Sequence, residues 1–194
     1  NNTFSNMEII RVVEEHGGEC WLSDIGEWIW YTDDEQRRRY IDEGKRYSRK
    51  NMVRSIKAGI QRRDEETLYE AFHAEFIGYE EPDHISEVLE YSWPYLPYTG
   101  ALGEMVLTTG KAIYLYRKGA DGIIDISPFS CMNGIVSEAV YHSVSRDHDN
   151  IPIRNFYFDA STSNMERDLD IFIELTHAYR RRKARPRQYP PCFA

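Results

Sequence analysis

Short apolar runs alternate with stretches of helical spacing in the C-terminal half of the chain. The runs 122–127 and 151–159 have the length and the content of β-branched and aromatic residues that are typical of buried strands, and residues 19–22 form a shorter strand candidate. Helical spacing follows the two longer runs, over about 132–146 and 164–179. Because helices alternate with strands, the pattern predicts right-handed crossovers and a parallel sheet in an α/β fold.

Helical patterns also precede these runs and interrupt the sheet-forming sequence. They predict helices over 4–16 and about 101–117. Between about 34 and 92, charged residues dominate and apolar residues recur at helical spacing, and an aromatic connector interrupted by two prolines follows at 93–98. We therefore expect one domain over 1–179, with a three-layer, mainly parallel, Rossmann-like or flavodoxin-like sheet and an all-helical insertion at about 34–92.

The size and charge of the chain agree with a single domain. With 194 residues, of which 41% are hydrophobic, the chain can bury one substantial core. The formal net charge is −8 although six basic residues lie between 180 and 187, so the remaining body is strongly acidic. An acidic body argues against nucleic acid as a partner. The basic, proline-containing segment 180–194 is expected to be a solvated, weakly ordered tail.

Cysteine usage and hydropathy indicate a soluble, cytoplasmic protein without a membrane partner. The three cysteines, at positions 20, 131 and 192, show no CxxC spacing, and an odd number does not suggest a disulfide framework. No apolar run approaches the ~20 residues of a spanning helix, and no signal-peptide pattern is present. The chain opens at Asn1 rather than at methionine, so we expect a C-terminal fragment of a larger protein whose upstream domains are its partners.

Cys131 lies where a strand pattern ends and a new helical pattern begins. Pro128 cannot continue a central ladder, and helical spacing restarts at about Met132. The carboxyl ends of strands form the ligand crevice of open parallel sheets, and a helix N-terminus favours a thiolate. Such a thiolate can bind a metal or act as a nucleophile, whereas the alternative is a small cysteine buried in a strand–helix corner. Asp159 follows the next strand at the same edge, either as a polar site residue or as a turn former.

Other motifs give weaker indications of chemistry. The sequence contains no G-x-G-x-x-G, P-loop or H-E-x-x-H motif, so nucleotide binding and zincin-type hydrolysis have no local support. His142, Asp147, His148 and Asp149 lie close together in sequence, either as ligands of a divalent metal or as solvated loop residues. No motif positions either histidine as a base for nucleophilic catalysis by Cys131.

Two segments of the chain resemble a known family. They are GEMVLTTGKAIYLYRKGADGIIDISPFSCMNG, residues 103–134, and IPIRNFYFDASTSNMERDLDIF, residues 151–172. Both are similar to the C-terminal region of the 2-hydroxyglutaryl-CoA dehydratase superfamily, and more closely to that of its large CoA-substrate-specific enzyme activases, the 2-hydroxyglutaryl-CoA dehydratase activators. The resemblance is strongest over about 100–172 and continues more weakly to Asn1.

The resemblance implies an iron-sulfur function for Cys131. In the family, a cysteine in a P-F-x-C-M-P-G context is a candidate ligand of a 4Fe-4S cluster, and the motif is matched here at Pro128, Phe129, Cys131, Met132 and Gly134, with Asn133 in place of the second proline. Because such clusters are normally held by several cysteines, the other ligands are expected upstream of Asn1.

The resemblance also implies a partner and a type of reaction. The reaction would be low-potential electron transfer, with an acyl-CoA dehydratase-type or electron-transfer partner, and Glu104 and Asp159 are secondary candidates for lining the same crevice. We expect no activity from this chain alone. The alternative is a noncatalytic docking or scaffold domain without a cluster, in which residues 93–98 and the helical insertion bind another domain or subunit.

Overall fold

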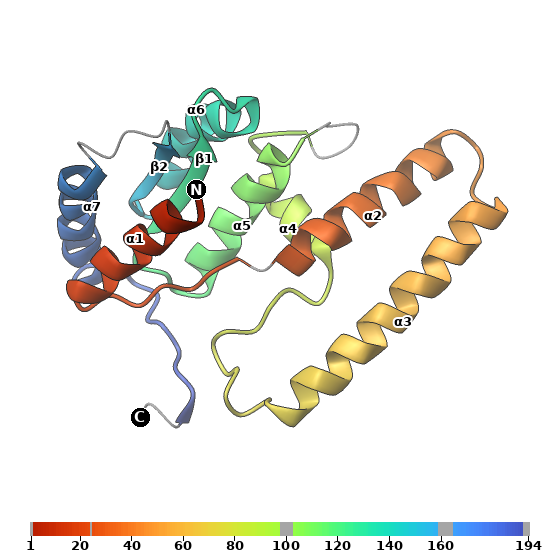
Figure 1. Ribbon diagram of the computed structural model, residues 1–194, viewed down its shortest axis with the longest axis horizontal. Helices are drawn as coiled ribbons and strands as arrows, with labels where there is room; N and C mark the ends of the chain where they lie inside the picture. The colour runs from red at the N-terminus through yellow and green to blue at the C-terminus, as the bar shows by residue number, and fades with distance from the viewer. Residues whose placement is uncertain (1, 24, 98–102, 159–164, 192–194) are drawn as a thin grey trace. The chain divides into compact units, whose positions relative to one another are not determined.

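The computed structural model describes residues 2–23, 25–97, 103–158 and 165–191 (Figure 1). The chain forms two compact units: an α/β unit of Asn1–Leu22 with Val88–Arg187, and a helical unit of Ser23–Glu87 with Gln188–Ala194. In chain order the described elements are α1 (Asn2–Glu15), α2 (Ile25–Asp42), α3 (Arg49–Ala71), α4 (Ile85–Ser92), α5 (Met105–Arg117), β1 (Ile123–Pro128), α6 (Met132–Asp147), β2 (Ile153–Phe158) and α7 (Met165–Arg180).

The described residues of the α/β unit contain a two-stranded parallel sheet, formed by β1 and β2. Ile123 pairs with Ile153 and Pro128 with Phe158, so the ladder runs along the whole of both strands. The helix α6 connects them, as the alternation of patterns predicts. The mixed α/β class is therefore confirmed, whereas the sheet of the described residues is smaller than the Rossmann-like sheet that we expected.

The strand predicted over 19–22 is wrong, because residues 18–23 form an irregular connector after α1. Gly17, with a φ of 75°, takes the left-handed conformation that ends a helix. The ring of Trp21 then lies 4.3 Å from the guanidinium carbon of Arg187 and 6.0 Å from Nζ of Lys111. Cation–π contacts therefore hold this connector where we expected a strand ladder.

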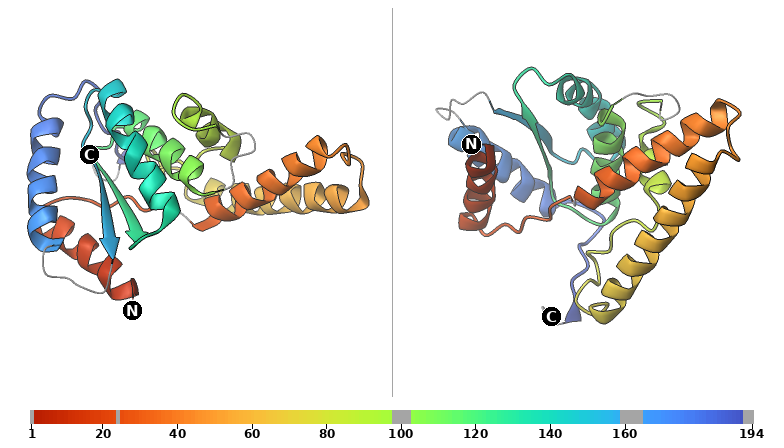
Figure 2. Two further views of the ribbon diagram at one scale, coloured as in Figure 1. Left: turned by 90° about the horizontal axis from the view of Figure 1, so that it is seen from above. Right: turned by 45° about the vertical axis from the view of Figure 1, so that its right-hand side comes forward.

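Helices cover both faces of the sheet. Phe156 belongs to a core cluster with Leu169 of α7 and Ile9 of α1. Ile123 belongs to a second cluster with Tyr141 of α6. The helices α1 and α7 therefore pack on one face, and α5 and α6 on the other (Figure 2).

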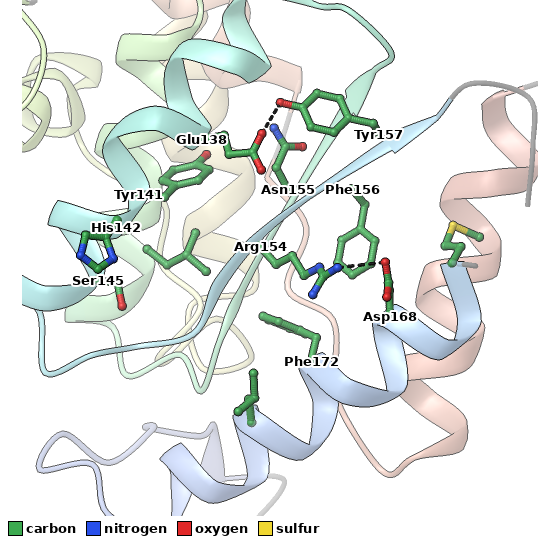
Figure 3. Close-up of a pocket in the computed structure, with 13 residues that line it drawn as sticks. Glu138, Tyr141, His142, Ser145, Arg154, Asn155, Phe156, Tyr157, Asp168 and Phe172 are labelled. Atoms are coloured by element: carbon green, nitrogen blue, oxygen red, sulfur yellow. Dashed lines mark hydrogen bonds and ion pairs between the residues drawn. The ribbon is translucent and has the colours of Figure 1, made fainter. Parts of the chain in front are cut away.

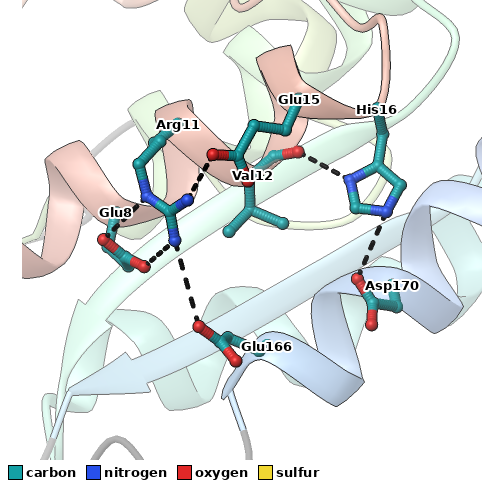
Figure 4. Close-up of polar contacts among 7 residues, drawn as sticks. All are labelled: Glu8, Arg11, Val12, Glu15, His16, Glu166 and Asp170. Atoms are coloured by element: carbon teal, nitrogen blue, oxygen red, sulfur yellow. Dashed lines mark hydrogen bonds and ion pairs between the residues drawn. The ribbon is translucent and has the colours of Figure 1, made fainter.

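Exposed charges border the contact between α1 and α7 (Figure 4). Arg11 of α1, which also binds two glutamates of its own helix, lies 3.9 Å from the carboxylate of Glu166. His16 Nε2 lies 3.5 Å from Asp170 Oδ1. Exposed pairs of this kind contribute little to stability, so the buried apolar residues between the two helices hold them together.

The helical unit contains an antiparallel hairpin of α2 and α3 (Figure 1). The hydroxyl of Ser48 accepts a hydrogen bond from the first turn of α3 and caps it. Trp30 Nε1 donates to Glu65 Oε1 at 3.1 Å, and the guanidinium of Arg54 lies 5.3 Å from the centroid of the Tyr40 ring. The helical structure of this unit begins with α2, before position 34.

Part of the basic tail contacts the α/β unit. Lys183 Nζ lies 2.6 Å from Asp121 Oδ1 and donates to the carbonyl of Gly119. Arg182 Nη2 donates to the carbonyl of Asn150 at 3.2 Å, and Arg187 Nη1 to that of Lys118 at 3.3 Å. Lys183 and Arg187 are therefore partly buried against the rest of the α/β unit, whereas residues 184–186 between them are exposed.

Candidate functional site

Cys131 lies at the carboxyl end of β1 and is the N-cap residue of α6. Its backbone N–H donates to the carbonyl of Pro128 at 3.0 Å, and its carbonyl accepts the N–H of Ile135 at 3.0 Å. Ser130 turns the chain between strand and helix with a φ of 60°. The strand, loop and helix predicted around Cys131 are therefore present.

The thiol of Cys131 is partly exposed. The side chains on either side of it are apolar and largely open to solvent, because Phe129 is 67% and Met132 75% exposed. Cys131 lies at the edge of the sheet where the sequence analysis expected a ligand crevice.

Glu104 is the N-cap residue of α5, and its side chain makes no capping hydrogen bond. A Cβ atom placed on the preceding Gly103 would lie 2.6 Å from Oδ1 of Asn133, so the first turns of α5 and α6 adjoin. The structure therefore brings the segments that carry Glu104 and Cys131 to the same edge. Asp159, the third predicted site residue, lies outside the described residues.

Two phenol–carboxyl pairs, one part-buried and one exposed, join α6 to the strands and were missed by the sequence analysis. Tyr141 OH donates to Asp125 Oδ2 at 2.7 Å. Tyr157 OH donates to Glu138 Oε2 at 2.7 Å (Figure 3). The sequence contains one signal for these pairs. Polar residues recur at alternate positions of the two apolar strands, and Asp125 and Tyr157 are two of these residues.

Burial governs the electrostatics of these pairs. Burial raises the pKa of Asp125. The hydrogen bond from Tyr141 lowers this pKa, but its effect is smaller than that of burial. Burial and the bond to Glu138 raise the pKa of Tyr157 to about 12, and a charge at Cys131 contributes in the same direction. Burial, followed by the charge of Asp125, also raises the pKa of Tyr141. Both phenols therefore keep their protons at neutral pH and act as hydrogen-bond donors.

The first turn of α6 packs directly on both strands. A Cβ atom on Gly134 would lie 2.3 Å from Oγ of Ser127, so only glycine allows this approach. Asn155 Nδ2 donates to the carbonyl of Gly134 at 3.1 Å, while Asn155 Oδ1 is buried and has no hydrogen-bond partner among the described residues. The strands therefore hold the N-terminus of α6, and with it Cys131, through Gly134.

A cavity of about 750 Å³ lies between α6, β2 and α7 (Figure 3). Glu138 and His142 line it from α6 and Asn155 from β2. An ion pair between Arg154 Nη2 and Asp168 Oδ2, 2.9 Å long, joins β2 to α7 within it. The cavity is therefore mainly polar toward α6 and carries a paired cation toward α7.

The other candidate ligands do not converge. His148 Nδ1 lies 2.7 Å from the carbonyl of Val144, and Asp149 accepts a hydrogen bond from Tyr116. Burial raises the pKa of Cys20, which disfavours its thiolate. Within the described ranges, no three histidine, cysteine, aspartate or glutamate side chains are grouped so that they could hold a metal ion. The described residues therefore bring no complete metal site together.

Comparison with known proteins adds no relative. No family model, no curated protein and no solved structure matches the chain. None of the helices in the described part of the chain has both the length and the apolar character needed to cross a membrane. The family resemblance of the sequence therefore stays a prediction.

We expect Asp125→Asn to change how stability depends on pH. The pKa of Asp125 is raised in the folded protein above its ordinary value of 3.8, so the unfolded chain loses this proton first. The contribution of Asp125 to the free energy of unfolding therefore falls as the pH rises from about 4 to about 7. Asparagine keeps an acceptor for Tyr141 and removes that fall. Urea unfolding of both proteins across this range measures the difference.

Asp147→Asn is the matched control for this experiment. The hydrogen bond from Arg146 lowers the pKa of Asp147, so its contribution has the opposite sign. This variant should keep the decline due to Asp125. An Asp125→Asn protein whose pH dependence equals that of the wild type would contradict the burial argument.

Proposed function

We propose that this chain is the C-terminal α/β domain of an iron-sulfur protein related to 2-hydroxyacyl-CoA dehydratases and their activases. In this proposal Cys131 supplies one thiolate ligand to a 4Fe-4S cluster. The observation that supports it is the place of Cys131, a partly exposed residue at the carboxyl end of β1 and the N-cap of α6. A bound cluster would supply one-electron transfer at low potential.

The remaining ligands have to come from outside residues 1–194. A cubane cluster is normally held by four cysteines. Cys20 is disfavoured by its raised pKa, Cys192 lies outside the described residues, and no three potential ligand side chains are grouped within the described ranges. The proposal therefore includes upstream segments of the same polypeptide, an electron-transfer or acyl-CoA dehydratase-type partner, and a reducing cytoplasm.

Polar side chains lie near Cys131. Burial and the bond to Glu138 raise the pKa of the Tyr157 phenol, which keeps its proton at neutral pH. Glu104 and Asn133 belong to the adjoining first turns of α5 and α6. Polar groups around a ligating sulfur tune its potential, and in this proposal these side chains have that role.

A Rossmann-like sheet is part of the proposal. The helices α6 and α7 lie on opposite faces of the described sheet. In this proposal helices cover both faces of the sheet, as in Rossmann-like folds, and the strands that complete it come from the upstream part of the polypeptide.

Iron content tests the role of Cys131. The full polypeptide is reconstituted anaerobically with iron and sulfide, and bound iron is counted in the wild type, Cys131→Ser and Cys20→Ser. Each cluster holds about four iron atoms, and a serine ligand replaces thiolate poorly. We expect Cys131→Ser to lose most of the bound iron, whereas Cys20→Ser keeps the wild-type content.

Equal iron in the wild type and Cys131→Ser would remove Cys131 from the ligand set. The docking function would then be favoured, and one observation supports it. Phe129, Met132 and Ile135 form an exposed apolar group beside Cys131, with Ile135 52% exposed. Such a group is typical of a surface that contacts another domain.

A further inference from the structure

The outward face of α3 is apolar along three turns. Met52, Val53, Ile56 and Ile60 recur at helical spacing and are between 57% and 61% exposed. The opposite face of α3 packs on α2, through contacts such as that between Glu65 and Trp30. The described residues of the helical unit therefore leave one side of a long amphipathic helix uncovered.

Charge is distributed unevenly along the same helix. Residues 44–63 contain eight basic and no acidic side chains, and residues 64–70 contain four acidic and no basic ones. Lys50, Asp64 and Glu70 are exposed, and no other described residue forms an ion pair or hydrogen bond with these side chains. The outward face is therefore basic at its N-terminal end and acidic at its C-terminal end.

The charges of α2 behave differently. Arg37 and Arg38 both bind Asp34, and Arg39 binds Glu35, all within one turn of the same helix. Local pairing of this kind is the usual arrangement on an exposed helix. On α3 itself Arg62 binds Glu66 in the same way, whereas Lys50, Asp64 and Glu70 form no such pair with the described residues.

We propose that α3 pairs with α3 of a second copy of this chain, in an antiparallel arrangement about a two-fold axis near residue 58. A two-fold axis makes an isologous contact, so the basic end of each helix meets the acidic end of the other. In this register Ile56 packs against Ile60 of the partner subunit. Position 50 lies opposite position 66 of the partner subunit, so Lys50 lies within one helical turn of Asp64 of the partner subunit.

The charge pattern favours a second copy over a membrane surface. An anionic bilayer attracts basic amphipathic helices and would attract residues 44–63. The same bilayer would repel the acidic residues that continue along the helix from Asp64 to Glu70. A second copy satisfies both ends at once, because it presents the opposite sign at each. This inference does not depend on the iron-sulfur proposal.

Charge reversal in pairs tests the arrangement. Sedimentation velocity of the full polypeptide over a range of concentrations gives the dissociation constant of the dimer for the wild type, Lys50→Glu and Asp64→Lys. Each single reversal places two like-charge contacts in the dimer and should weaken it at least about tenfold. In an equimolar mixture of the two variants every contact joins opposite charges, so the mixture should recover the wild-type affinity as a heterodimer.

Two further variants separate this surface from general effects. Ile56→Ser removes apolar contact without changing charge and should also weaken the dimer, and its exposure makes loss of folding unexpected. Arg146→Glu is a matched reversal at an exposed position of α6 and should leave the dimer unchanged. Any one of three results would overturn the proposal. The wild type could be monomeric, Lys50→Glu and Ile56→Ser could leave the dimer intact, or the mixture of variants could fail to recover the wild-type affinity.

Discussion

Gly110→Ala is expected to destabilise the protein by about 3 kcal/mol. Gly110 lies within α5, and α5 crosses α4 there so closely that a Cβ atom would lie 2.0 Å from the backbone oxygen of Val88. Backbone cannot rotate away as a flexible side chain can, so the two helices must separate. Because both are buried at this point, that separation also loses apolar contact. Urea unfolding at neutral pH measures the effect.

Gly59→Ala is the matched control for this prediction. Gly59 also lies inside a helix, α3, but nothing lies within 4 Å of the position of its Cβ atom. Alanine forms helix more readily than glycine, so this variant should gain about 0.5–1 kcal/mol. Equal and small effects at both positions would show that α4 and α5 do not approach as closely as described.

Leu169→Ala is expected to cost about 2–5 kcal/mol. Leu169 is fully buried at the centre of the cluster that joins α7 to the sheet and to α1. Truncation there leaves a cavity beside Phe156 and Phe172, whose rings meet edge to face 6.3 Å apart and cannot collapse freely. Thermal or urea unfolding measures the loss.

Leu175 offers the same substitution on the same helix at an exposed position. Its side chain is 55% exposed, so Leu175→Ala should change the free energy of unfolding by less than about 0.5 kcal/mol. A Leu169→Ala protein as stable as Leu175→Ala would mean that α7 does not pack on the sheet. The comparison therefore tests the arrangement of the α/β unit as well as the contribution of one residue.

Local patterns were sufficient to predict most elements of the α/β unit. The strand expected over 122–127 is observed at Ile123–Pro128, and the helix expected from about 132 begins at Met132. These boundaries were predictable because the apolar spacing changes abruptly at Pro128. Residues 19–22 show the limit of this approach, since a short apolar run next to Gly17 and Gly18 became a connector held by distant cations.

The site was predictable only where it depends on neighbours in sequence. The position of Cys131 follows from one strand and one helix that flank it, and it was predicted. The bond between Asp125 and Tyr141 joins residues 16 positions apart across an element boundary, and no periodicity reports such a contact. A complete ligand set could not be predicted for the same reason, because ligands brought together by tertiary structure leave no local pattern.

The close approach of Gly134 to Ser127 has a mechanical consequence for the sulfur beside it. The first turn of α6 rests directly on the side chains of Ser127 and Asn155, so helix and sheet are held together as one rigid body. The position of Cys131 is therefore fixed by the packing of α6 on the sheet and not by its own short turn. A side chain held in this way is preorganised, and little atomic rearrangement accompanies a change in its charge.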